Sequence, residues 1–486
     1  MRLPIMLSLS LLVLPVTVFS AEAPLALSLN EAIRMAVEKN LDVRAELYNP
    51  AQFEADINRN RSIYDPLLNL QTSYTDSESA ISSVGQTLRL DSSISQLFWT
   101  GGTAAIDFNN GYGNVFTPSK SWQTGLGISL NQPLLKNVGR EATEVAINIS
   151  RYSKFASLER FNARLLSTVA QVRTEYFKLY SLREGRDVKK VSLDLAKKIL
   201  SETEARVRAG VLPAMEVLNA EFGVVTREKE LIDAELAVSN QLDVLRLLLQ
   251  MEAKAGDLQT VDLPPRDRFD ATEAEAIQKA LNRPDIREQK RNLELYELQT
   301  KNFSQKTRPD LALTASAQLT GTDSEYQKNM NKVLGADYPV WSFGLNLSYP
   351  LGNGAAENDY RRSRLKTEQT SLQLRSLEEN AAKEVKAAIR GIVTGFKQIE
   401  VADRGAKYAE ERLRAFMRKN EVGLATTKDV LDVENDLATA RNNQINAVVG
   451  YANALTLYWQ ITGELLEKEG IRVVEDDADK LYTSTR

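Results

Sequence analysis

The sequence predicts a mainly α-helical fold with a β part, built from two copies of one structural unit. The turn segments Arg208–Glu221 and Arg418–Asn435 match when Gly423 is aligned with Gly210, 213 residues earlier. Long stretches without proline carry apolar residues at helical spacing, and shorter stretches alternate apolar and polar residues. A repeat at a fixed offset indicates a duplicated fold.

The composition limits the class of protein. With 486 residues, 26% charged and 43% hydrophobic, the chain is long enough for a large structured protein and too polar for a helical membrane bundle. Its net charge of −4 does not favour a nucleic-acid partner. The chain has no Cys and no His, which excludes disulfides, thiol catalysis and the commonest transition-metal ligands. Since it also lacks serine-centred and paired-carboxylate motifs, we expect no enzyme activity and no cofactor.

The N-terminus has the pattern of a signal peptide over residues 1–20. An apolar run, Leu3–Val18, leads to a small residue at the expected cleavage position, Ser20. The alternative, a membrane anchor, is disfavoured by Pro4 and Pro15. Without Cys the mature N-terminus cannot carry a lipid. Because no later apolar run is long enough for a transmembrane helix, any membrane-crossing part would have to be a β-barrel.

Each half of the sequence is expected to begin with equatorial helices, over residues 28–64 and 271–307. Ser28 and Glu31 have the spacing of a capping box at the start of the first helix. We expect Asn49-Pro50 to break this helix, because proline lacks the backbone N–H group that a helix interior uses.

Alternating runs predict strands over residues 65–134 and 308–351. In Trp341–Tyr349, large apolar residues share one face and small polar residues share the other. This pattern suits a strand between lipid and water, although an ordinary half-buried antiparallel strand has it too. The first half also has a strand–Gly-Gly–strand signal over residues 92–108, which predicts an extra hairpin.

Long helical hairpins are expected over residues 139–250 and 355–463. Glu141–Val207 contains no proline and would be about 100 Å long at about 1.5 Å per residue. Apolar residues on heptad positions predict coiled helix-on-helix packing in both hairpins. Residues 251–270 are interpreted as the linker between the repeats and residues 464–486 as an acidic tail.

The turns of the two hairpins carry the candidate site residues. Gly210 and Gly423 follow helices, as left-handed C-terminal caps do. Asp429 and Asp432 lie in the first turn of the next helix and project from nearly the same helix face. Taken alone they are ordinary partners of the helix dipole, and Glu216 in the first hairpin is interpreted in that way.

The strand count has a consequence for assembly. Four strands, or six with the extra hairpin, are too few for a water-filled barrel, since the smallest closed barrels have about eight. Open sheet edges are not viable in lipid. If the strands span a membrane, several chains must share one barrel, and the helices would form a tube continuous with it.

These features together resemble the TolC-like outer membrane factors of bacterial efflux and type I secretion systems, over essentially the whole mature chain. The resemblance rests on the repeat, the strands that start after proline, the strand ends and the hairpin tips, namely Gln132-Pro133-Leu134, Tyr349-Pro350-Leu351, Val211–Asn219 and Val422–Asp432. It implies a homotrimer in the outer membrane that extends into the periplasm. A shared β-barrel would contact outer-membrane lipid, and a periplasmic α-barrel would dock with a periplasmic adaptor (membrane fusion) protein and an inner-membrane pump.

The resemblance also implies roles for individual residues. The family carries two aspartates three residues apart at the narrowest point of the pore, and Asp429 and Asp432 match them. In a trimer they would form stacked rings that attract cations and raise one another's proton affinity. Members close to TolC itself have an entrance latch with a Tyr three residues before the tip glycine and an Arg two after it. Here Asn420 and Ala425 occupy those positions.

Other functional classes remain as alternatives. The main one is a coiled-coil surface or adhesin-type structural protein anchored in the outer membrane, which would be expected to carry one barrel segment and not two inserted hairpins. A periplasmic enzyme lacks motif support. A conventional porin is disfavoured by the helical content. The sequence predicts neither the transported substrate nor the direction of transport.

Overall fold

The computed structural model describes residues 25–77, 85–114, 119–251, 258–471 and 476–484. The expected signal peptide, residues 1–20, lies outside these ranges, as do residues 252–257 of the expected linker. The chain divides into two compact units. Unit 1 contains Met1–Asn40, Val169–Phe269 and Gly391–Thr456, and unit 2 contains Leu41–Thr168, Asp270–Arg390 and Leu457–Arg486.

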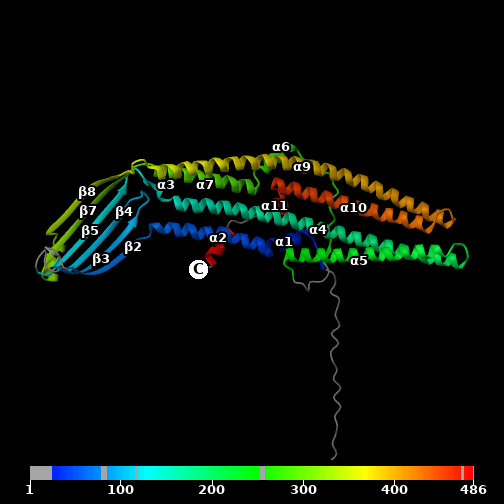
Figure 1. Ribbon diagram of the computed structural model, residues 1–486, viewed down its shortest axis with the longest axis horizontal. Coiled ribbons are helices and arrows are strands. Elements are labelled where there is room, and N and C mark those ends of the chain that lie inside the picture. The colour runs from blue at the N-terminus through cyan, green and yellow to red at the C-terminus, as the bar shows by residue number, and fades with distance from the viewer. Residues whose placement is uncertain (1–24, 78–84, 115–118, 252–257, 472–475, 485–486) are drawn as a thin grey trace, which may run out of the picture. The chain divides into compact units, whose positions relative to one another are not determined.

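Unit 2 contains a six-stranded antiparallel sheet with the strand order β2-β3-β4-β5-β7-β8 (Figure 1). The strands are β2 (Leu67–Ser77), β3 (Gly85–Leu97), β4 (Thr103–Gly113), β5 (Ser121–Pro133), β7 (Asp310–Asp323) and β8 (Tyr338–Ser348). The two halves of the sequence meet where β5 pairs with β7. The predicted extra hairpin is confirmed as β3 and β4, which turn through Gly101 with φ +85°.

The pairing register separates the side chains of the sheet into an apolar face and a polar face. Since adjacent paired residues point the same way, the register aligns Leu70 with Ser92, Ile106 with Ile128, and Ala317 with Trp341. The exposed large side chains of the apolar face are Leu68, Leu70, Tyr74, Leu88, Leu90, Ile94, Ile106, Leu126, Ile128, Leu130, Trp341, Phe343, Leu345 and Leu347. The alternation predicted from the sequence is therefore confirmed.

Unit 2 also contains helices. They are α2 (Leu41–Arg61), α3 (Arg140–Thr143), α6 (Glu273–Ala280), α7 (Pro284–Lys306), α8 (Tyr326–Leu334), α11 (Leu465–Lys468) and α12 (Asp476–Ser484), with a 3₁₀ turn at Ser62–Tyr64. In the tail, α12 is held near α2 because Lys154 Nζ lies 2.8 Å from a carboxylate oxygen of Glu54 and 2.6 Å from one of Asp479.

The expected helix break at Asn49-Pro50 is wrong. Pro50 lies inside α2 and is buried, whereas the break falls at Asn40, whose backbone is extended with ψ 125°. Proline in a helix costs about 3 kcal/mol, because it removes one hydrogen bond and crowds the preceding turn. Packing of the buried face of α2, which includes Pro50 and Ala51, offsets this cost.

Unit 1 is mostly helical. It contains α1 (Leu29–Lys39) and α5 (Met215–Leu249), and it shares α4 (Val145–Arg208), α9 (Gly354–Glu421) and α10 (Thr427–Thr462) with unit 2. The predicted capping box of α1 is present, since Ser28 Oγ accepts from Glu31 N–H and the Glu31 carboxylate accepts from Ser28 N–H. Helices α4 and α5 form one hairpin, and α9 and α10 form the other (Figure 1).

A short parallel pair, β1 (Leu25–Leu27) with β6 (Leu258–Thr260), was not predicted from the sequence. It is held by Tyr176, whose hydroxyl donates to the Leu27 carbonyl at 2.8 Å and accepts from Val261 N–H at 3.1 Å. Within the described ranges, none of the helices combines the length and the apolar character that crossing a membrane requires.

Candidate functional site at the hairpin tips

The two hairpin tips have the same backbone geometry. Gly210 and Gly423 adopt φ +72° and +76°, as predicted for left-handed caps. In the first tip the N–H of Val211 donates to the carbonyl of Arg206, and in the second the N–H of Leu424 donates to that of Lys419. Each is the six-to-one bond of a Schellman motif. The two tips therefore share this hydrogen bond, as the predicted repeat requires.

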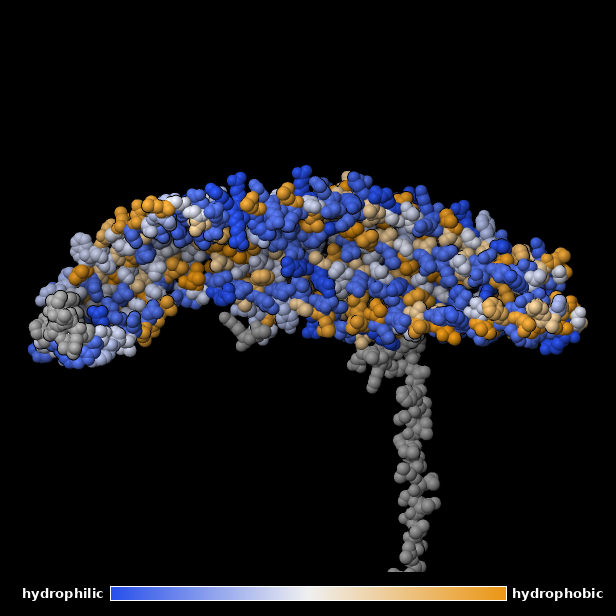
Figure 2. Space-filling view, in the orientation of Figure 1, coloured by the Kyte–Doolittle hydropathy of each residue, from blue (hydrophilic) through white to orange (hydrophobic). Residues whose placement is uncertain are grey.

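Apolar side chains lie exposed around both turns. Val211, Val422 and Leu424 are 70%, 69% and 77% exposed. Figure 2 shows hydrophobic residues gathered where α5 and α10 meet their turns. Contiguous exposed apolar patches are typical of surfaces that another protein covers.

Asp429 is part of a capping box. Its carboxylate accepts hydrogen bonds from the N–H and the hydroxyl of Thr426, at 2.8 and 2.7 Å, and Thr426 Oγ1 accepts from Asp429 N–H at 3.1 Å. These bonds stabilise the charged form, so they lower the pKa of Asp429. This direction is opposite to the one expected from a ring of like charges. Within a single chain, therefore, Asp429 acts as a helix-start residue.

Asp432 lies one turn further along α10 and is exposed, as Asp429 is. Asp436 continues the same face, but Arg412 Nη1 lies 2.7 Å from its carboxylate. Three acidic residues thus follow one face of α10, and the two nearest the tip carry the negative charge that faces solvent.

The two tips are bonded to each other. Arg206 Nη1 donates to the backbone carbonyl and to the side-chain oxygen of Asn420, at 3.0 and 3.1 Å. The Glu216 carboxylate accepts from the N–H of Thr427 at 3.3 Å, so Glu216 caps the helix of the other hairpin. Asn420 therefore joins the two hairpins through Arg206. The sequence pattern did not indicate either contact.

A buried ion pair joins the hairpins about two turns into α10 and about three turns into α5. Arg227 of α5 donates to Glu434 of α10 at 2.9 and 3.2 Å and to the carbonyl of Leu431 at 3.1 Å. Ser192 of α4 donates to the other oxygen of Glu434. Arg227 and Glu434 are only 8% and 3% exposed. Charges so buried are strongly coupled, and removing one is costly.

The helices can approach closely here because Gly223 has no side chain. A Cβ at this position would lie 2.7 Å from Leu431 Cδ1. Around this contact a cluster of buried apolar residues draws members from all four long helices, among them Leu193, Val224, Leu413 and Val430.

The opposite side of α5 carries an exposed apolar stripe. Its residues recur every three, four or seven positions and are 60–76% exposed: Met215, Leu218, Phe222, Val225, Ile232 and Leu236. The heptad pattern of the sequence predicted helix-on-helix packing but did not identify this stripe. A second stripe at helical spacing is the pattern of a helix that packs on both sides.

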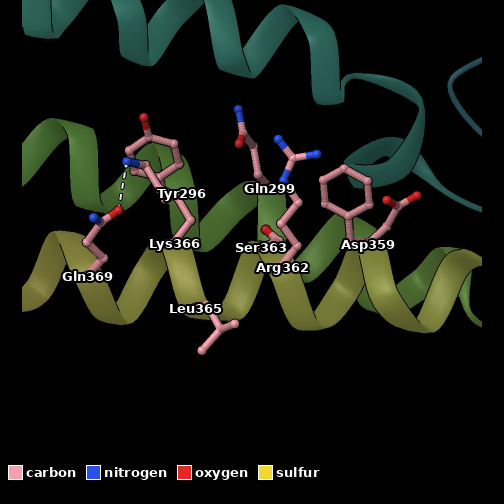
Figure 3. Close-up of a pocket in the computed structure, with 9 residues that line it drawn as sticks. Tyr296, Gln299, Asp359, Arg362, Ser363, Leu365, Lys366 and Gln369 are labelled. Atoms are coloured by element: carbon pink, nitrogen blue, oxygen red, sulfur yellow. Dashed lines mark hydrogen bonds between the residues drawn. The ribbon is translucent and has the colours of Figure 1, made fainter.

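In unit 2, a groove of about 750 Å³ lies between α7 and α9 (Figure 3). Arg362 and Lys366 are its two cationic residues. Lys366 is engaged locally, because its Nζ lies 5.4 Å from the centre of the Tyr296 ring and donates to Gln369 at 3.0 Å.

Several solved structures share this fold. The outer membrane channel CmeC of Campylobacter jejuni is 17% identical, with a TM-score of 0.68, 94% of this chain covered and 90% of that one. VceC of Vibrio cholerae is 15% identical, with a TM-score of 0.68 and 90% and 96% covered. The open state of the MtrE channel of Neisseria gonorrhoeae is 19% identical, with a TM-score of 0.61 and 90% and 89% covered.

A sequence relative is nodulation protein T of Rhizobium leguminosarum bv. trifolii. It is 24% identical over 253 residues, which cover 51% of this chain and 53% of that protein. The match therefore spans about half the length of this curated relative.

The fold is thus that of outer-membrane channels. The chain belongs to the outer membrane efflux protein family, which matches residues 32–249 and 276–463. It is a protein of the outer membrane that extends into the periplasm, and the family resemblance inferred from the sequence is confirmed.

Proposed function

We propose that the protein is the outer-membrane channel of a tripartite efflux or type I secretion system, a passive homotrimeric conduit from the periplasm to the exterior. The observation that carries the proposal is the six-stranded sheet with one apolar, exposed face and one polar face. Strands that separate lipid from a water-filled interior have this alternation.

The open edges of the sheet support a trimer. Among the described strands, β2 and β8 are the edges of the sheet. Lipid cannot satisfy the N–H and C=O groups of an edge strand. Three copies of a six-stranded sheet, joined edge to edge, supply eighteen strands. Barrels of about 16–18 strands are wide enough to enclose an aqueous channel.

The exposed stripe on α5 supports the same assembly. Phe222 and Val225 are 76% and 63% exposed in a single chain. In the trimer, helices of a neighbouring copy cover this stripe, so that the hairpins close into a periplasmic α-barrel.

The hairpin tips form the periplasmic entrance in this proposal. Asp429 and Asp432 of three chains would form two stacked acidic rings, about one helical turn apart. The rings narrow the pore, attract cations and bind multivalent cations that block it. The turns at Gly210 and Gly423, with their exposed apolar residues, are the docking surface for the helical hairpin of a periplasmic adaptor, which connects the channel to an inner-membrane pump.

Single-channel recording in planar bilayers, with chemical cross-linking of the same preparation, tests the proposal. We expect cross-linked trimers and discrete conductance steps. A stable monomer that gives no conductance would refute the proposal and favour the alternative of a coiled-coil surface protein.

A further inference from the structure

Helix α8 covers one end of the apolar face of the sheet. It lies in the connection between β7 and β8, at the end of these strands remote from α7 and α9. Asn329 and Val333 of α8 are 0% and 1% exposed. The side-chain amide of Asn329 donates to Thr124 Oγ1 at 2.6 Å, and Thr124 belongs to the apolar face through its alternation with Leu126.

The sheet is shaped to receive this helix. A Cβ at Gly321 would lie 2.6 Å from the Asn329 carbonyl and 2.8 Å from Val333 Cγ2. Thr124, opposite Gly321 in the register, donates in turn to Asn110 at 2.8 Å. Only glycine at position 321 permits this approach, so the docking of α8 is specific.

An aromatic cluster flanks the same contact. The Trp122 ring lies 5.0 Å from that of Tyr326 in α8 and 4.8 Å from that of Tyr112 in β4. Tryptophan and tyrosine are enriched at the level of lipid headgroups, where one end of the ring is apolar and the other is wet.

The outward side of α8 is mainly polar. Gln327, Lys328 and Asn331 are exposed there, and the apolar Leu334 at the end of the helix is 70% exposed. The lysines are paired locally, because Lys328 lies 2.7 Å from Glu325 and Lys332 lies 2.8 Å from Asp323. The helix thus covers part of the apolar face and presents a mainly polar surface with little net charge. Such a surface does not suit the hydrocarbon interior of a membrane.

The length of β8 also indicates that α8 lies at the level of the lipid headgroups. Its 11 residues, Tyr338–Ser348, begin directly after α8. At about 3.3 Å per residue and a tilt of about 40°, they span about 28 Å along the barrel axis, close to the height of about 25 Å that the apolar band has in outer-membrane barrels. Helix α8 therefore lies where this band ends.

We propose that α8 is an interfacial helix that lies in the headgroup layer of the outer leaflet and contacts lipid headgroups through its polar side. This inference rests on the proposed function, because it requires the apolar face to meet lipid. It adds a lipid-contact surface and a fixed outer boundary for the hydrocarbon band.

Spin-label depth measurements test this inference, and the absence of Cys from the chain makes single labelling clean. Labels are introduced by Gln327→Cys and Asn331→Cys in α8, by Leu345→Cys in the middle of β8, and by Val422→Cys as an aqueous reference. The protein is reconstituted in phosphatidylethanolamine–phosphatidylglycerol vesicles, and collisions with oxygen and with a water-soluble nickel complex are compared.

The label at 345 should report hydrocarbon, and those at 327 and 331 an intermediate depth within about 5–10 Å of the acyl boundary. The role of α8 would be overturned if the labels at 327 and 331 were as accessible to the nickel complex as the label at 422, while the label at 345 still reported hydrocarbon. If 345 itself reports water, the proposed membrane channel fails instead.

Gly321→Leu provides a second measurement, since it displaces α8 while the strands keep their pairing. In this background the label at 331 should lose its intermediate depth and become fully aqueous, and the label at 345 should not change. Gly111→Leu is the matched control. Gly111 lies at the same end of the sheet on the polar face, where a Cβ would be 3.4 Å from Arg89 Cγ, an ordinary contact. An unchanged depth at 331 in Gly321→Leu would mean that sheet docking does not position α8.

Discussion

Replacing Glu434 by Gln should release the two helical hairpins from each other near their tips. The Glu434 carboxylate accepts two hydrogen bonds from Arg227, at 2.9 and 3.2 Å, and a third from Ser192. Glu434→Gln keeps the shape but leaves the Arg227 charge buried without compensation. Breaking one side of a buried pair costs about 3–5 kcal/mol, and the retained amide puts this case near about 3 kcal/mol. Since about 1.4 kcal/mol is tenfold, the joined state loses about two orders of magnitude in population relative to the separated one.

The distance between the tips can be measured by pulsed electron resonance. Spin labels at Val211 and Val422, both exposed, report the separation of the hairpins within one chain. We expect a longer and broader distance distribution in Glu434→Gln than in the wild type. Single-channel conductance should rise in parallel, because separated hairpins widen the proposed entrance.

Two controls make this test specific. Lys189→Gln removes a more exposed pair with Glu230, within the first hairpin, and should change stability by less than about 1 kcal/mol and leave the tip distance alone. Arg227→Met with Glu434→Leu replaces both charges by apolar groups, which is often neutral or stabilising. The reasoning is refuted if Glu434→Gln keeps the wild-type distance, or if the apolar double variant is as open as the single one.

Four further predictions concern the tips and the core. Replacing Asp429 and Asp432 by Ala should reduce cation selectivity and weaken block by a trivalent cation in single-channel recordings; unchanged values would leave them as helix-start carboxylates. Capping lowers the pKa of the Asp429 carboxyl in the folded protein. The stabilisation of the fold by this cap is therefore complete above about pH 4, the pKa of an unfolded Asp, and is lost as the pH falls through the lower pKa of the folded state. Gly210→Val with Gly423→Val should abolish co-purification with the adaptor, because valine resists φ > 0, and retained co-purification would move docking elsewhere. Burial raises the pKa of Tyr176 to about 12, so its contribution, on the order of 2–3 kcal/mol, holds below about pH 10 and is lost between about pH 10 and 12. Tyr176→Phe should remove this part of the alkaline unfolding seen by circular dichroism, and an unchanged profile would contradict the assignment.

Local features of the fold could be predicted because they depend on neighbours in sequence. The alternation of strand residues follows from a period of two, and the cap at Gly423 from the need for a positive φ. The capping boxes Ser28–Glu31 and Thr426–Asp429 each join residues three positions apart. In all these cases the physical cause lies within one turn or one strand.

Features that depend on distant partners could not be predicted in this way. Glu216 looks like a dipole partner of its own helix, yet its carboxylate accepts from Thr427, 211 residues away. Arg227 and Glu434 are 207 residues apart, and in the sequence each looks like an ordinary surface charge on a heptad helix. The break expected at Pro50 failed because tertiary burial overrides the local cost of proline in a helix.

The two hairpin tips differ in how their return helices are capped. Both tips keep the same glycine turn, but only the second begins its return helix with a side-chain cap, Thr426; in the first, Ala214 occupies the cap position without a side-chain hydrogen bond. The first tip instead supplies Arg206 and Glu216, which bond to the backbone of the second. Side chains of the first hairpin therefore stabilise the second hairpin, which carries the exposed carboxylates of the proposed pore. Loosening the first hairpin should for this reason disturb the second, whereas changes in Asp429 or Asp432 leave both of these inter-hairpin contacts intact.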